Sequence, residues 1–235
     1  MTAILLAWAA SAAILLGLAA VLGSRVRLPG EPGKMLKLWV IAILVDNRGR
    51  FSLNRLQLVA WSIVVISLVS GVFFGRLIEG VEDPLNFTIP DRVLGLLGIS
   101  IGTGVTTGAV KATKKVKAEA DKIAAPAAGK AASRLATYQA TLKEPSFWQV
   151  FMLEEGDYAD DAVDVTKFQG FAITIVLVVA YVAMAIHSIV ETKVASGVMS
   201  LPNIAGTFLV LLGISYGGYI GGKLPTQTGS PRREA

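Results

Sequence analysis

Cysteine is absent from the 235-residue chain, and histidine occurs once. Without cysteine the chain has no disulfide, no thiolate metal site and no cysteine nucleophile, and its redox compartment stays undecided. Charge is also scarce, because Asp, Glu, Lys and Arg make up 17% of the residues, compared with about 25% in soluble domains. The deficit falls in long uncharged runs, so the composition predicts a multi-pass membrane protein with one small polar region.

Asp, Glu, Lys and Arg are missing altogether from four apolar runs, at about 57–75, 93–110, 168–190 and 204–220. Proton relays, voltage sensors and coupled transporters usually need such groups within the bilayer. The sequence also lacks a P-loop, a metal-ligand spacing and a potassium-filter motif. We therefore expect a protein that is not an enzyme and that has no cofactor and no metal site.

What the chain does contain is an internal repeat. Arg55-Leu56-Gln57 and Pro90 recur as Lys167-Phe168-Gln169 and Pro202, and 33 residues separate glutamine from proline in both copies. The sequence Leu-Leu-Gly-Ile-Ser then follows each proline. A duplicated apolar unit at this spacing predicts two copies of a transmembrane helical hairpin.

The repeat extends upstream of the hairpins. Trp39 and Trp148 each precede an acidic residue by seven positions, in the apolar stretches 36–45 and 145–153. Ten apolar residues are too few to span a bilayer, so we interpret both stretches as interfacial helices. Whether 36–45 lies in the interface or spans is left open by the sequence.

The predicted fold class is an all-α integral membrane protein with about five transmembrane helices, in which two parallel interfacial-helix-plus-hairpin repeats follow an N-terminal helix. The first span is the uncharged run 2–23. The domains expected are the N-terminal transmembrane helix 1–24, repeat 1 at 25–110, a cytoplasmic helical linker at 111–144, repeat 2 at 145–222 and a disordered cytoplasmic tail at 223–235.

Charge placement predicts the orientation. Nineteen of the 22 Lys and Arg residues lie in 24–56, 111–167 and the tail, whereas Arg76, Arg92 and Lys193 lie in the intervening loops. By the positive-inside rule, the N-terminus is outside and the C-terminus cytoplasmic, in a plasma or inner membrane. Both hairpins then start from the cytoplasm, which makes the repeats parallel, unlike the inverted repeats common in transporters.

Small and hydroxylated residues fall on opposite faces of the third and fifth predicted helices at 100° per residue. The glycines predict close helix packing, as in GxxxG motifs: Gly95, Gly98, Gly102, Gly206, Gly213 and Gly217. The hydroxyl faces either bond back to their own helix or line a wet path. The pore-lining candidates are Ser100, Thr103, Thr107, Ser215 and Tyr219.

Four other polar features have both a structural and a functional interpretation. Gln57 and Gln169 hold equivalent positions, where they serve as caps and interhelical contacts or as a polar ring at a pore entrance. His187 is typical of an interface residue rather than a metal ligand. The acidic run 154–161 lacks the ligand order of an EF-hand and is typical of a solvated face. Contact with anionic lipid headgroups is expected for Lys111, Lys114, Lys115 and Lys117.

Two functions follow from this pattern. The favoured hypothesis is a channel- or pore-like subunit for small ions or solutes, in a homo-oligomer that uses the hydroxyl faces. The alternative is a non-catalytic membrane anchor or scaffold that binds a protein partner through its cytoplasmic linker. The expected partners are therefore a bilayer with anionic headgroups, further copies of the chain and a protein on the linker. Nucleic acid is not expected, because the positive charge is explained by membrane orientation.

Overall fold

The computed structural model describes residues 2–25, 39–46, 49–102, 105–106, 109, 146–153, 161–191 and 199–221. Within them, three helices are long and apolar enough to cross a membrane: α1 (Thr2–Gly23), α3 (Leu53–Ile78) and α6 (Val165–Glu191). The fold is all-α apart from one pair of two-residue strands. These helices support the membrane-protein class. The linker 111–144 and the tail 223–235 lie outside the described residues.

Two shorter helices follow α3 and α6. The first covers residues 91–102, and the second is α7 (Gly206–Gly221). The 16 residues of α7 reach about 24 Å at a rise of about 1.5 Å per residue, which is less than a hydrocarbon core of about 30 Å. The five-span count therefore stays a prediction.

Local chemistry fixes where the helices begin and end. Asp164 Oδ1 caps α6 by accepting hydrogen bonds from the backbone N–H groups of Thr166, at 3.0 Å, and Lys167, at 3.3 Å. Ser52 stands at the corresponding position before α3, but its side chain makes no capping bond. After α3, Gly80 takes φ 73°, a left-handed conformation that glycine adopts at no steric cost.

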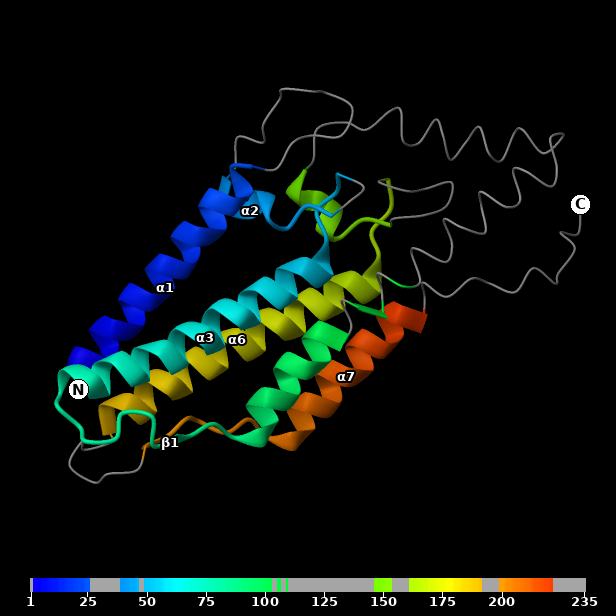
Figure 1. Ribbon diagram of the computed structural model, residues 1–235. Coiled ribbons are helices and arrows are strands. Elements are labelled where there is room, and N and C mark those ends of the chain that lie inside the picture. Colours follow the sequence, from blue (N-terminus) through cyan, green and yellow to red (C-terminus); the bar gives the residue numbers. More distant parts are fainter. Residues whose placement is uncertain are drawn as a thin grey trace, which may run out of the picture.

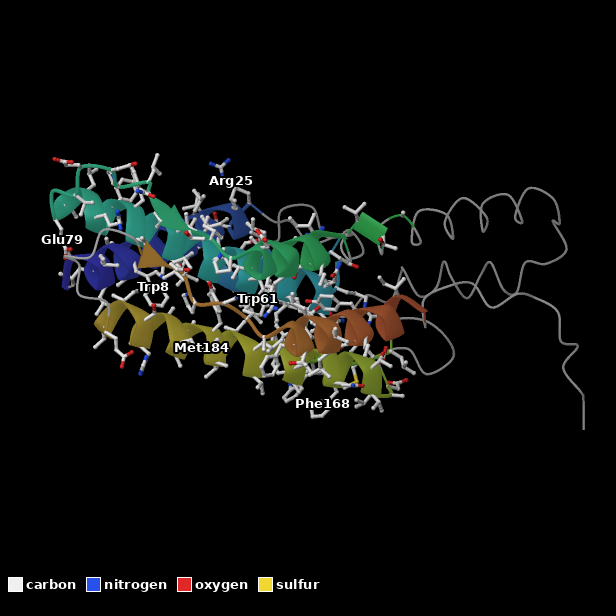
Figure 2. The ribbon with its side chains drawn as sticks, turned by 90° about the horizontal axis from the view of Figure 1, so that it is seen from below. Trp8, Arg25, Trp61, Glu79, Phe168 and Met184 are labelled. Atoms are coloured by element: carbon white, nitrogen blue, oxygen red, sulfur yellow. The ribbon has the colours of Figure 1, made fainter. Side chains whose placement is uncertain are left out.

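The helices form two layers. Figure 2 shows α3 and the 91–102 helix on one side and α6 with α7 on the other. In Figure 1, α3 and α6 run side by side, and α1 leans against α3 at one end and diverges from it at the other. The core between the layers contains Trp61, Leu96, Tyr181 and Leu212. The Trp61 and Tyr181 rings meet edge to face, with their centroids 6.2 Å apart.

Glycines allow α1 to approach α3 closely. A Cβ built on Gly71 would lie 2.5 Å from the Trp8 Cα, and one on Gly75 would lie 2.5 Å from the Ile4 Cα. The N-terminal part of α1 thus lies beside the C-terminal part of α3, so the two helices are antiparallel. Close to this contact, Trp8 Nε1 donates a hydrogen bond of 3.0 Å to Ser67 Oγ.

The segments expected to be interfacial helices each contain a short helix in the part that the structure describes. These are α2 (Trp39–Ala42) and the 3₁₀ helix η2 (Phe147–Val150), with four residues each. The chain then turns back on itself, because Val45 pairs with Phe51 and Met152 pairs with Val163 in isolated antiparallel bridges. A short helix followed by a paired turn thus precedes both α3 and α6.

A second small core lies at this end of the bundle. Phe51 lies just before α3 and Leu53 at its start. In this core they pack with Val150 and Phe151, which lie at the end of η2 and just after it. The rings of Phe51 and Phe147 meet edge to face at 6.1 Å. At the opposite end, β1 (Phe87–Thr88) pairs in parallel with β2 (Met199–Ser200), with Phe87 opposite Met199 and Thr88 opposite Ser200.

Candidate functional site: a buried polar cluster

Gln57 is the centre of a polar cluster inside the bundle. Its side chain is buried in the second turn of α3, and the amide Nε2 donates to the Gly170 carbonyl at 3.1 Å and to Thr174 Oγ1 at 2.9 Å. Thr174 Oγ1 donates in turn to the Gly170 carbonyl at 2.8 Å. These bonds join α3 to α6, where the low dielectric of the interior strengthens them.

Gly170 lets the helices come this close. A methyl group added there would lie 3.2 Å from Ser215 Oγ and 3.5 Å from Gln57 Nε2. Ser215 comes from α7, so a third helix reaches the same place. The cluster therefore depends on Gly170, which the sequence analysis did not single out, as well as on Gln57, which it did.

Ser100 and Ser215, two of the pore-lining candidates, belong to this cluster. They are only 1% and 7% exposed, and the Ser215 hydroxyl makes no hydrogen bond among the described residues. The Tyr216 hydroxyl lies within hydrogen-bonding reach of the Ser100 and Thr174 side chains. The structure thus brings both repeat-equivalent serines into the interior of one chain.

The remaining pore-lining candidates cannot be assigned to this cluster from the described residues. Thr103 and Thr107 lie outside the described residues, as do Lys111, Lys114, Lys115 and Lys117. Tyr219 lies in α7, and only its backbone is described. Gln169 is exposed, although its repeat equivalent Gln57 is buried, so the two glutamines do not have matching environments.

Among the described residues, the predicted packing glycines have no close neighbour on another helix, with two exceptions. A Cβ on Gly98, Gly102, Gly213 or Gly217 would have no atom within 4 Å. A Cβ on Gly95 would lie 3.9 Å from Leu209 Cδ1, and one on Gly206 would lie 3.8 Å from Arg92 Cζ. Close packing by the first four thus requires a second molecule.

The glycine pair that does pack, Gly71 and Gly75, was missed in the sequence. Its signal is a GxxxG step within the apolar run of α3, the motif that was noted in the other helices. The spacing alone did not distinguish glycines that face a neighbouring helix from glycines that face outward. The position of α1 beside α3 shows that Gly71 and Gly75 face a neighbouring helix.

Basic side chains at equivalent positions in the first turns of α3 and α6 donate hydrogen bonds to backbone carbonyls of the segments that precede the helices. Arg55 Nη1 donates to the Val45 carbonyl at 2.6 Å, and Lys167 Nζ donates to the Met152 carbonyl at 2.7 Å. In both cases the acceptor belongs to a residue of an antiparallel bridge. Arg50 Nη2 also donates to the Leu153 carbonyl, at 3.3 Å, and so connects the turn before α3 to the turn before α6.

The segments 98–102 and 213–217 both have the spacing Gly-x-Ser-x-Gly, but each lies within a helix, whereas a nucleophile elbow needs a strand-to-helix turn. His187 pairs instead with Glu191, with its Nε2 3.3 Å from Oε1, on the exposed surface at the far end of α6. No group of three His, Cys, Asp or Glu side chains suited to a metal ion occurs in the part of the chain that the structure describes.

Comparison with known proteins gives no further guide to the function, since no protein-family model, no curated protein and no solved structure matches this chain.

Proposed function

We propose that the protein is a non-catalytic membrane anchor or scaffold, which holds the basic segment 111–144 at the cytoplasmic surface for a protein partner. The observation that carries this proposal is the filled interior. Trp61, Leu96 and Leu212 are completely buried between the two layers, and Ser100 and Ser215 are enclosed with them. A bundle packed in this way suits a rigid support better than a path within a single chain.

The proposed architecture keeps two parallel repeats and five spans, with the N-terminus outside. The positions of the elements support it. α3 and α6 begin 112 residues apart, at Leu53 and Val165, and the paired strands β1 and β2 are separated by the same 112 residues. The 91–102 helix and α7 begin 115 residues apart, which matches the three extra residues after Pro202.

Helix directions support the same topology. α3 and α6 are parallel, because the early residue Gln57 of α3 contacts the early residues Gly170 and Thr174 of α6. α1 is antiparallel to α3. With an outward N-terminus, α1 would enter the cytoplasm, and α3 and α6 would both leave it. The five lysines within 111–122 then lie on the cytoplasmic side, where anionic headgroups attract them.

The anchoring role can be tested with the full chain carrying an affinity tag in its native membrane. After mild solubilisation, one protein should co-purify in near-stoichiometric amount. It should be lost when residues 111–144 are replaced by a Gly/Ser segment of equal length. Gln169→Leu, at an exposed position of α6, serves as the matched control and should retain it. The proposal fails if no stoichiometric partner is found, or if the partner remains after the replacement.

A second candidate is a homo-oligomeric pore between chains, and the open glycine faces favour it. Gly98 and Gly102 in one helix and Gly213 and Gly217 in another leave room for a second backbone. Under this hypothesis, Gly98→Leu and Gly213→Leu would lower the oligomer mass in mild detergent while the monomer stays folded. An unchanged mass in both variants would mean that these faces contact lipid.

A further inference from the structure

A groove of about 340 Å³ lies between α1, α3 and α6 and is open on one side. All three helices contribute lining residues, and those of α1 are Leu5, Trp8, Ala9 and Ala12. These four recur at i, i+3, i+4 and i+7, so they share one face of the helix. In Figure 1, α1 diverges from α3 toward its own C-terminal end, and the groove lies in the fork between them.

The lining favours an apolar occupant. Apart from Trp8, Ser67 is the one lining residue with a polar side-chain group. Its hydroxyl accepts from Trp8 Nε1 at 3.0 Å and donates to the Val64 carbonyl at 3.2 Å, so the two polar groups satisfy each other. Apolar cavities of this kind stay dry and take apolar ligands.

The groove lies at the depth of the acyl chains. The 26 residues of α3 extend about 39 Å, and its lining residues Ile63 and Ser67 lie about 15 and 21 Å from its start. They therefore face the middle of a hydrocarbon core about 30 Å thick. A groove of this volume is at the small end of the pockets that hold small molecules, so it suits a single chain better than a helix about 10–12 Å across.

We propose that this groove binds one acyl chain of an anionic phospholipid from the cytoplasmic leaflet. The fork opens toward the end of α1, where Arg25 is exposed and suits a phosphate. Ala12 lies 11 residues before Gly23, about 17 Å along the helix, which matches one leaflet of about 15 Å. The segment 25–37 adds further positive charge, with four basic residues and one acidic residue in all.

Photo-crosslinking tests the groove with the full chain in bilayers of phosphatidylglycerol that carries a diazirine on one acyl chain. Tandem mass spectrometry should find the adducts concentrated at Trp8 and Ala12 rather than at Ile14, which lies opposite the groove on α1 and is 69% exposed. An even spread would mean boundary lipid alone. Adducts at Ile14 without any in the groove would mean that a helix of another molecule covers it. Either result overturns the proposal.

Two neighbouring alanines give matched variants. Ala12→Leu fills the groove and should remove most of the adducts at Trp8, whereas Ala13→Leu makes the same change at an exposed position outside the lining and should keep them. Equal adduct yields in the two variants would contradict the site. Should Ala12→Leu fail to fold, Ala9→Leu enters the groove from the same face of α1, and the adduct map of the unaltered chain still decides.

The headgroup is tested by repeating the labelling with phosphatidylcholine that carries the same chain. The unaltered chain should give more groove adducts with phosphatidylglycerol, and Arg25→Gln should remove this preference. No preference in the unaltered chain, or one that Arg25→Gln leaves intact, would overturn the anionic headgroup. Only the choice of leaflet rests on the proposed orientation. The bilayers present the same lipid on both sides, so loss of the partner on 111–144 and loss of the lipid site are separate results.

Discussion

At the scale of single residues, sequence equivalence does not mean structural equivalence. Gln57 is buried and makes two hydrogen bonds to the second hairpin, whereas Gln169 is exposed. The repeat located both residues, but it could not show that α6 turns its neighbour Gly170 toward α3. Burial depends on how two helices rotate against each other, and a repeated tripeptide carries no information on that rotation.

The two glutamines give a matched pair of variants. Gln57→Leu should destabilise the protein by about 1–3 kcal/mol, because it removes the two buried hydrogen bonds of the Gln57 amide. Gln169→Leu should change the stability by less than about 0.5 kcal/mol, as is usual for surface substitutions. Thermal unfolding in detergent measures both. Equal losses would mean that the Gln57 amide contributes nothing specific.

Glycine positions can be compared in the same way. Gly71→Leu should displace α1, because even a Cβ there would lie 2.5 Å from the Trp8 backbone, and overpacking costs about 1–3 kcal/mol or more. Gly98→Leu has open space around it within one chain, so monomer stability should be unaffected. Trp8 fluorescence and thermal unfolding report both effects. A stable Gly71→Leu variant with unchanged fluorescence would contradict the α1–α3 contact.

At the scale of elements, long apolar helices were the most predictable feature. The uncharged run 2–23 coincides with α1, while α3 and α6 extend the predicted ranges by a few residues at each end. The short apolar stretches before the hairpins each contain a helix of four described residues, and the bridges that follow, such as Val45 to Phe51, depend on backbone pairing across a turn. Ten apolar residues suit a helix or an extended segment equally well, so their periodicity does not decide.

The helix caps lead to an element-scale prediction. Asp164→Ala should cost about 1 kcal/mol, because the Asp164 carboxylate satisfies two backbone N–H groups at the start of α6. Ser52→Ala should cost less through the cap, because the Ser52 side chain makes no such bond at the start of α3. Unfolding of the two variants, measured in parallel, checks the difference. A larger loss for Ser52→Ala would contradict the capping geometry.

At the scale of the whole molecule, the start of the first hairpin is buried by other segments of the chain, whereas the start of the second hairpin is exposed. Leu53, at the start of α3, is 3% exposed, but its equivalent Val165, at the start of α6, is 73% exposed. The segment around η2 lies over the first hairpin, and α1 packs mainly on α3. In Figure 2, Trp61 lies between the layers and Phe168 lies on the outer side of α6. A duplicated sequence therefore gives an asymmetric bundle, because the N-terminal helix occurs only once.

The proposed orientation is tested with single cysteines, which carry no background in a chain without native cysteine. Asp83→Cys lies in the loop after α3 and should react with an impermeant thiol reagent added to intact cells. Ala118→Cys lies in the basic linker and should react only after the membrane is opened. Labelling of Ala118→Cys from outside would contradict the topology and the cytoplasmic anchoring that depends on it.

A closed bundle is the central claim, since it separates the anchor from a pore that runs through a single chain. Purified protein in liposomes should pass small ions and neutral solutes no faster than empty liposomes do, at any tested pH, voltage or Ca²⁺ level. In the described part of one chain, Trp61, Leu96 and Leu212 fill the space between the two layers. Flux above the empty-liposome rate that Ser100→Leu reduces, without a change in oligomer mass, would contradict the account and favour the pore.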